Sequence, residues 1–236
     1  MTTRQYPIGR TSPFLYGLLR LIVNLVHPLI ARLHIEGVER IPASGPVIIA
    51  MNHVAWVDTV LAAVRCPRPF QYMAKIELFS VPVIGFLIKR WGAFPVNRGA
   101  GDREALRTAE RVLAEGKLLV IFPEGHRSRG GPLLPGQPGT ALIALRTGAP
   151  IVAVGISGTQ GVFKGFHYGP FAPRVTIRYS EPFHVGVPGQ KHTRETLIQA
   201  TDEVMRQIAA LLPPEQRGQY GETAPAAPSP SESLPA

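Results

Sequence analysis

The sequence lacks the features that mark several common classes of protein. Its 236 residues contain one cysteine, Cys66, so no intramolecular disulfide can form and the chain fits a reducing compartment. Aromatic residues make up only 8%, and no RNP-like, helix-turn-helix or zinc-finger pattern occurs. No cysteine and histidine spacing suits a metal, and the G-x-S-x-G elbow of many hydrolases is missing. We therefore expect no nucleic acid as a partner and no metal as a cofactor.

Acidic residues are also scarce relative to basic ones. Lys and Arg number 25 against 16 Asp and Glu, which gives a formal net charge of +9. Such an excess indicates an anionic partner, for example an acidic membrane surface or a phosphorylated substrate. Hydrophobic residues make up 45% of the chain, which is enough apolar material for the core of one large domain.

No apolar run is continuous enough to predict a membrane span, and no cleaved signal peptide is indicated. Residues 14–33 follow the helical period instead, with apolar side chains on one face and Arg20, Asn24 and His27 opposite. This pattern is typical of a helix that lies in a membrane interface, and we assign residues 1–34 to a membrane-associated helical arm. A core-packing helix kinked at Pro28 explains the segment nearly as well, so that alternative stays open.

Between residues 35 and 212, short apolar segments alternate with helical ones. Strands are predicted at 46–51, 70–75, 93–97, 117–125, 150–157 and 174–183. Helices are predicted from about Trp56 and at 78–90, 102–116, 139–148 and 193–212. The alternation predicts an α/β domain with a largely parallel mixed sheet flanked by helices, and functional loops at the carboxyl ends of the strands. Residues 213–236 are rich in Pro, Ala and Ser, and we expect them to be disordered.

Two polar residues frame the junction after the first of these strands. In the sequence NHVAWVD, His53 follows the strand and Asp58 comes five residues later. In one regular helix they would diverge by about 140°, but they can meet if His53 lies in the loop and Asp58 in the first helical turn. A carboxylate on one imidazole nitrogen leaves the other as a general base, and a substrate hydroxyl is its natural target. The alternative is a capping Asn52 beside a structural histidine, and the spacing alone favours it.

Polar residues follow three further predicted strands. The loop FPEGHRSRGG contains Glu124, Gly125 and Arg127, and guanidinium groups and glycine amides suit a phosphate. Arg98 and Lys75 each end a shorter strand. Each residue could be an ordinary solvated side chain, but separate surface roles do not explain why all of them fall at strand ends.

Together these segments resemble the lysophospholipid and glycerophosphate acyltransferase family, most of all its bacterial 1-acylglycerol-3-phosphate acyltransferases. NHVAWVD, GAFPVNRG, FPEGHRSR and APIVAVGI follow the order of the four blocks of that family. The resemblance implies that His53 is the general base and that Asp58 orients it. It also implies that Arg98 binds the phosphate of the acceptor and that Glu124 and Arg127 bind the acceptor as well.

The resemblance implies an enzyme that moves a fatty acyl group from an acyl thioester to the free hydroxyl of lysophosphatidic acid, giving phosphatidic acid. The donor would be acyl-CoA or acyl-acyl carrier protein, and no further cofactor is expected. We expect the protein at the cytoplasmic face of the cell membrane, peripheral or monotopic, in contact with anionic lipid.

Two departures from the family pattern leave the acceptor open. His126 stands where threonine is commoner, and Gln137 stands where lysine is commoner. Glycerol-3-phosphate, another lysophospholipid or an aminolipid are therefore alternative acceptors. A non-catalytic lipid-binding protein is the alternative from another functional class.

Overall fold

The computed structural model describes residues 6–8, 13–63, 65–97, 101–162, 169–186 and 193–221. The strands are β1 (Arg32–Glu36), β2 (Val47–Met51), β3 (Phe70–Lys75), β4 (Ala93–Val96), β5 (Leu118–Ile121), β6 (Ile151–Ser157) and β7 (Arg174–Tyr179). The α-helices are α1 (Pro13–Ile30), α2 (Asp58–Ala63), α3 (Pro82–Arg90), α4 (Arg103–Ala114), α5 (Gly139–Thr147) and α6 (Arg194–Ala210). A 3-10 turn, η2 (Ile76–Ser80), precedes α3, and we refer to the two together as the η2–α3 segment.

The strands form one seven-stranded sheet in the order β1-β7-β6-β2-β5-β3-β4. Strands β6, β2, β5, β3 and β4 are parallel to one another, whereas β7 runs antiparallel to β6 and pairs with β1 in parallel. The central strands β2 and β5 are buried along their whole length, as expected for parallel strands covered on both faces. The predicted α/β fold with a largely parallel mixed sheet is confirmed.

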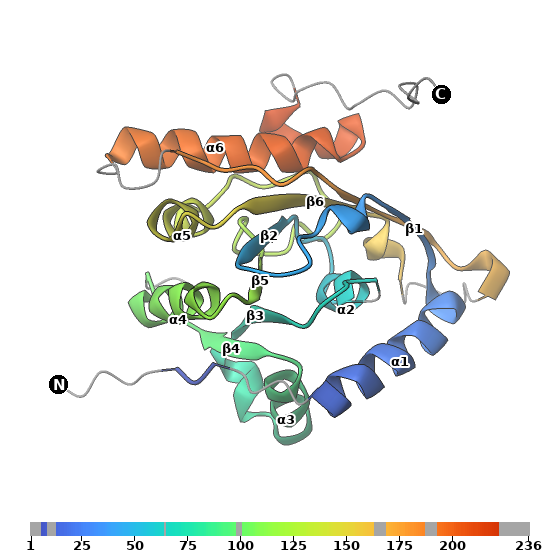
Figure 1. The fold of residues 1–236 in the computed structure, drawn as a ribbon. Helices are drawn as coiled ribbons and strands as arrows, with labels where there is room; N and C mark the ends of the chain where they lie inside the picture. Colours follow the sequence, from blue (N-terminus) through green and yellow to red (C-terminus); the bar gives the residue numbers. More distant parts are fainter. Residues whose placement is uncertain are drawn as a thin grey trace, which may run out of the picture.

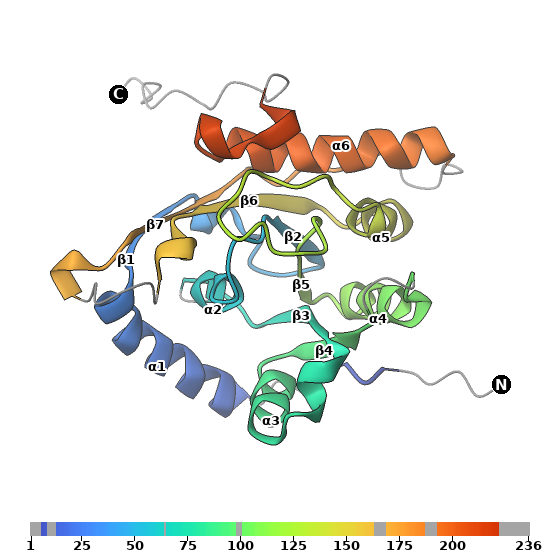
Figure 2. The same cartoon turned by 180° about the vertical axis from the view of Figure 1, so that it is seen from behind.

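Helices cover both faces of the sheet (Figures 1 and 2). Alternate side chains of β2 show the division: Val47 and Ile49 pack into one apolar cluster, and Ile48 and Ala50 pack into the other. The first cluster includes residues of α1, α2 and α3, and the second includes residues of α4, α5 and α6. Because β2, β5, β3 and β4 are parallel, their carboxyl ends meet at one edge of the sheet, where the predicted functional loops lie.

The predicted boundary of the N-terminal arm at residue 34 is wrong. Helix α1 ends at Ile30, and Arg32–Glu36 forms β1, which pairs with β7 as an edge strand of the sheet. The five residues RLHIE alternate between exposed and half-buried positions. A strand this short at a sheet edge gives too little periodic signal to separate it from the preceding helix.

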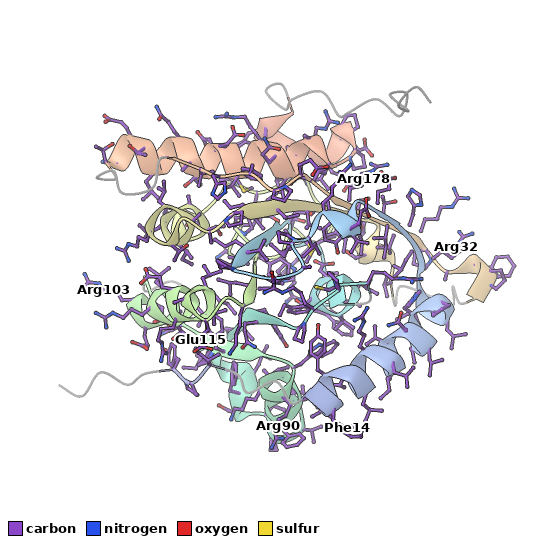
Figure 3. All side chains as sticks on the ribbon, viewed as in Figure 1. Phe14, Arg32, Arg90, Arg103, Glu115 and Arg178 are labelled. Atoms are coloured by element: carbon purple, nitrogen blue, oxygen red, sulfur yellow. The ribbon has the colours of Figure 1, made fainter. Side chains whose placement is uncertain are left out.

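Helix α1 turns most of its apolar side chains outward and its polar side chains toward the protein. Phe14 is 80% exposed and Leu25 is 67% exposed, and Phe14 lies at the outer edge of the molecule in Figure 3. Arg20, Asn24 and His27 are half-buried. A core-packing helix would have the reverse orientation, so the structure does not support that alternative. No helix within the described ranges is long and apolar enough to span a bilayer.

The predicted disorder from residue 213 is also wrong for the first part of the tail. Residues 214–216 and 218–220 form two short 3-10 turns, and Tyr220 is buried against the α4–α5–α6 side of the sheet. The Tyr220 hydroxyl accepts a hydrogen bond from the amide of Gly136 at 3.1 Å, and the carbonyl of Gln216 accepts one from Leu133 at 2.8 Å. One buried tyrosine therefore holds a segment whose composition predicts disorder. Residues 222–236 lie outside the described residues.

Candidate active site

His53 and Asp58 meet at the carboxyl end of β2. His53 lies in the loop after the strand and Asp58 is the first residue of α2, so that Nδ1 of His53 lies 2.8 Å from Oδ2 of Asp58. The predicted convergence is confirmed. Asp58 is fully buried and His53 is 7% exposed. Since an ionised carboxylate can only accept, Nδ1–H donates to Asp58 and Nε2 is left with a free lone pair.

The carboxylate of Asp58 also shapes the loop that carries His53. Its Oδ2 accepts hydrogen bonds from the amides of Val54 at 2.7 Å and Ala55 at 2.8 Å. Oδ1 is buried and has no hydrogen-bond partner among the described residues. One oxygen atom thus holds two consecutive backbone amides and the imidazole ring together.

The backbone of His53 is held by the loop after β5. The amide of His53 donates to Oε1 of Glu124 at 2.5 Å, and its carbonyl accepts from the amide of Ser128 at 2.7 Å. The neighbouring Asn52 pairs its side-chain amide with both backbone groups of Ile156, at 2.9 and 2.7 Å. The loop after β5, 71 residues away in the sequence, thus positions His53, and strand β6 holds its neighbour Asn52 from 104 residues away.

Glu124 faces the interior of this loop cluster. Only 2% of its surface is exposed, and its second oxygen accepts from the amide of Leu134 at 2.8 Å. Burial raises the pKa of its carboxyl group to about 7, although the two amide hydrogen bonds act in the opposite direction. Both oxygens are thus engaged by the backbone, and the residue supports the His53 loop in this structure.

A largely apolar cavity of about 500 Å³ lies in front of His53. The ring of Phe122 stacks on the imidazole, with 4.0 Å between centroids and 25° between planes. The remaining wall includes Trp56 of the loop before α2, residues of α2, Tyr72 of β3 and Ile84 of the η2–α3 segment. We name this space the His53 cavity. Its size and lining suit a hydrocarbon chain carrying a polar end near the histidine.

The other predicted site residues have different positions. Arg127 and Lys75 line the His53 cavity, and Lys75 forms an ion pair with Glu77 at 3.0 Å. Gly125 adopts φ = 71°, a left-handed conformation that suits glycine, and it lines a different cavity. Arg98 lies outside the described residues. No group of three His, Cys, Asp or Glu side chains within the described part of the chain could hold a metal ion.

Two structurally important residues did not emerge from the sequence as parts of the site. Phe122 precedes the glutamate-containing turn and reads as the end of an apolar strand, yet it stacks on His53. Asn52 reads as a helix cap, whereas its side chain bridges to β6. One hint in the sequence indicated that these residues belong to the site: Asn52 is next to His53, and Phe122 is two residues before Glu124.

Comparisons with known proteins agree on one family. A family model described as "Acyltransferase" matches residues 32–157. A 1-acyl-sn-glycerol-3-phosphate acyltransferase of Bacillus subtilis is 30% identical over 174 residues, which cover 73% of this chain and 84% of the relative. A protein with the same name from Borreliella burgdorferi is 33% identical over 131 residues, covering 55% and 52% of the two chains. The crystal structure of the 1-acyl-sn-glycerophosphate acyltransferase PlsC of Thermotoga maritima matches with a TM-score of 0.64 at 28% identity, covering 80% of this chain and 76% of that chain.

Proposed function

This chain belongs to the acyltransferase family, and we propose that it moves a fatty acyl group from an acyl thioester to the free hydroxyl of 1-acylglycerol-3-phosphate, giving phosphatidic acid. The Bacillus, Borreliella and Thermotoga proteins carry this acceptor in their names. The observation that carries the proposal is the 2.8 Å contact between His53 and a fully buried Asp58 at the wall of an apolar cavity.

In the proposed reaction, Nε2 of His53 takes the proton of the acceptor hydroxyl as its oxygen attacks the thioester carbon. The Asp58 carboxylate stabilises the resulting imidazolium and keeps the ring in the correct tautomer. The tetrahedral intermediate then collapses with cleavage of the C–S bond. The imidazolium returns the proton to the departing sulfur, so that the products are the ester and a free thiol.

The intermediate carries a negatively charged oxygen that needs hydrogen-bond donors. The amides of His53, Val54 and Ala55 are not available for this role, because Glu124 and Asp58 accept their hydrogen bonds. The donors must therefore come from another part of the site. Among the described residues of the cavity wall, Arg127, Tyr72 and Thr59 carry suitable N–H or O–H groups.

Among the described residues, Arg127 is the best candidate for binding the phosphate of the lipid acceptor. It reaches the His53 cavity from the same loop that holds the backbone of His53, and a guanidinium can bind two phosphate oxygens at once. Lys75 lines the same wall, but its ammonium group is also paired with Glu77. We expect Arg127 to contribute more than Lys75 to acceptor affinity.

The outward apolar faces support docking on a membrane surface. Exposed apolar side chains gather on α1 and on the η2–α3 segment, which lie near each other at one side of the molecule in Figures 1 and 2. The His53 cavity is bounded by the same η2–α3 segment through Leu78 and Ile84. A helix that lies in the interface buries such a face among lipids. A lipid acceptor could thus enter the cavity directly from the bilayer, and the net charge of +9 favours anionic membranes.

The test is to incubate the purified full chain with a panel of lyso-acceptors and with acyl-CoA or acyl-acyl carrier protein, and to identify products by mass. We expect phosphatidic acid from lysophosphatidic acid, and none from a folded His53→Ala variant. If the only acylated product comes from a different acceptor, the proposed reaction stands but the proposed acceptor is wrong. Lipid binding without product from any pair of substrates would refute the enzymatic proposal.

A further inference from the structure

A second cavity lies on the opposite face of the sheet from His53. It has a volume of about 440 Å³ and is bounded by the first turns of α4 and α5, the loop after β5 and Leu197 of α6. Most of its wall is apolar, including Leu106, Ile121 and Ile143, whereas Asn97 and His126 also contribute polar groups. We name this space the α4–α5 cavity. The proposed reaction leaves it without a role.

The α4–α5 cavity is adjacent to the reacting centre. Met73 and Phe122 line both this cavity and the His53 cavity. The Phe122 ring that stacks on His53 is therefore also part of the wall of the second space. These two shared side chains place the α4–α5 cavity next to the space in which the imidazole lies.

A buried hydroxyl in the wall of this cavity has no hydrogen-bond partner among the described residues. Thr140 lines the cavity and is 3% exposed, and its Oγ1 makes no hydrogen bond to any described residue. An unpaired buried hydroxyl is costly, so a missing partner is a reasonable inference. Thr140 is the second residue of α5, whose N-cap Pro138 supplies no side-chain hydrogen bond. The hydroxyl and the N-terminal turn of α5 thus offer donors to a ligand that carries hydrogen-bond acceptors.

The charge of the cavity favours an uncharged ligand group that accepts hydrogen bonds. Asp102 also lines it, and this carboxylate accepts hydrogen bonds from the amides of Asn97, Glu104 and Ala105 and from the hydroxyl of Tyr6, at 2.8 to 3.2 Å. Asp102 is thus held in place and would repel an anion nearby. A carbonyl oxygen fits the donors of α5 without that repulsion, and the apolar wall suits methyl and methylene groups.

We propose that the α4–α5 cavity binds the uncharged, amide-containing part of the pantetheine arm of the acyl donor. This inference rests on the proposed function, in which the donor is an acyl thioester. Both coenzyme A and acyl carrier protein carry that arm, which combines two amides with aliphatic groups. The donor would approach from the α4–α5 side of the sheet, and the lipid acceptor from the α1–α3 side. The thioester would then meet the acceptor hydroxyl beside Phe122 and His53.

Steady-state kinetics of Thr140→Val test this site, because the substitution removes the hydroxyl and keeps the shape of the side chain. We expect the donor KM to rise about three- to tenfold, the range for one lost neutral hydrogen bond, with acceptor KM unchanged. Thr140→Ser should restore the donor KM. The matched control is Thr159→Val, because Thr159 is equally buried and unpartnered among the described residues but lines neither cavity.

Gly139→Leu provides a second test by filling the cavity. A Cβ at Gly139 would meet only the Cδ2 atom of Leu106, at 3.9 Å, so the backbone can accept a side chain there. We expect the donor KM to rise at least tenfold. The increase should be similar with acyl-CoA and acyl-acyl carrier protein, because the arm is common to both.

The outcomes separate this inference from the proposed function. If wild type acylates no lyso-acceptor, the proposed function fails. If the wild-type protein acylates a lyso-acceptor but the folded variants Thr140→Val and Gly139→Leu keep the wild-type donor KM, the proposed function stands and only the pantetheine site is refuted. Effects on acceptor KM would assign the cavity to the acceptor instead. Effects that disappear when the acyl chain is shortened on the same arm would assign it to the acyl chain, and either result overturns the inference.

Discussion

Replacing Glu124 with glutamine should change the pH dependence of stability. Burial raises the pKa of this carboxyl group from 4.5 to about 7 in the folded protein. Between these values the folded protein holds a proton that the unfolded chain has lost. The stabilisation by that proton is fully present below about pH 4.5 and disappears as the pH rises through 7. A glutamine at this position cannot titrate.

The size of the effect follows from the two pKa values. At pH 5 the raised pKa of Glu124 contributes about 2.5 kcal/mol to the free energy of unfolding, and at pH 8 it contributes almost nothing. The stability of wild type relative to Glu124→Gln should therefore be about 2 to 3 kcal/mol lower at pH 8 than at pH 5. Urea unfolding of both proteins at the two pH values measures this difference.

An exposed carboxylate serves as the control. Glu195→Gln, in the first turn of α6, should change stability by no more than about 0.5 kcal/mol at either pH. If the difference between wild type and Glu124→Gln is the same at pH 5 and pH 8, the carboxyl group titrates normally and the reasoning from its burial is wrong.

The kinetics of the same variant distinguish two roles for Glu124. In the structure each carboxylate oxygen accepts a hydrogen bond, one from the amide of His53 and one from the amide of Leu134. Glutamine has one oxygen and one NH2 group in their place, so it can keep only one of these hydrogen bonds. A loosened His53 loop should lower kcat while the acceptor KM changes little. The family resemblance instead implies that Glu124 binds the acceptor, which predicts a rise in acceptor KM. A large KM effect with unchanged kcat would therefore refute the supporting role.

Three further outcomes are expected from the site and from α1. His53→Ala should abolish nearly all turnover in a folded protein, and Asp58→Asn should lower kcat by up to about 10⁴-fold, as in comparable triads; product formation by mass measures both. Arg127→Ala should raise the KM for a water-soluble short-chain acceptor about tenfold or more, and Arg127→Lys should not restore it; an unchanged KM would remove Arg127 from the phosphate site. Leu25→Asp on α1 should weaken sedimentation of the protein with anionic vesicles. The control Ile198→Asp on α6 should not, although both side chains are more than half exposed. Equal vesicle binding by the two variants would show that α1 does not dock on membranes.

The sheet and the position of the site were predictable because buried parallel strands leave a simple signal. The segments VIIAM of β2 and LLVI of β5 are continuous apolar runs. Asn52 and His53 directly follow the first run, and Glu124 follows the second after Phe122 and Pro123. Such runs bounded by turns indicate strands, and the carboxyl ends of parallel strands meet. The convergence of His53 and Asp58 followed from the same reasoning.

The orientation of Glu124 could not be predicted for a physical reason. A carboxylate in a turn at a strand end can project toward a substrate or fold back onto nearby amides, and both arrangements use the same residue type at the same position. The choice depends on where the amides of His53 and Leu134 lie, and the first of these is 71 residues away in the sequence. A local pattern identifies the residue, but the long-range pairing of two loops determines its partners.

The orientation of helix α1 also could not be predicted from a local sequence pattern. Its period separates an apolar face from Arg20, Asn24 and His27 but does not say which face meets the protein. In water, the protein core would compete for the apolar face. Here the protein contacts α1 through Tyr16, which is buried, and through Val23 and Ile30, and it leaves side chains such as Leu21 and Leu25 exposed. The described part of the chain provides no other element over that face, and the membrane surface proposed above would cover it. The orientation of α1 therefore depends on what surrounds the protein, which the period of one helix does not contain, and it supports the proposed docking on a membrane surface.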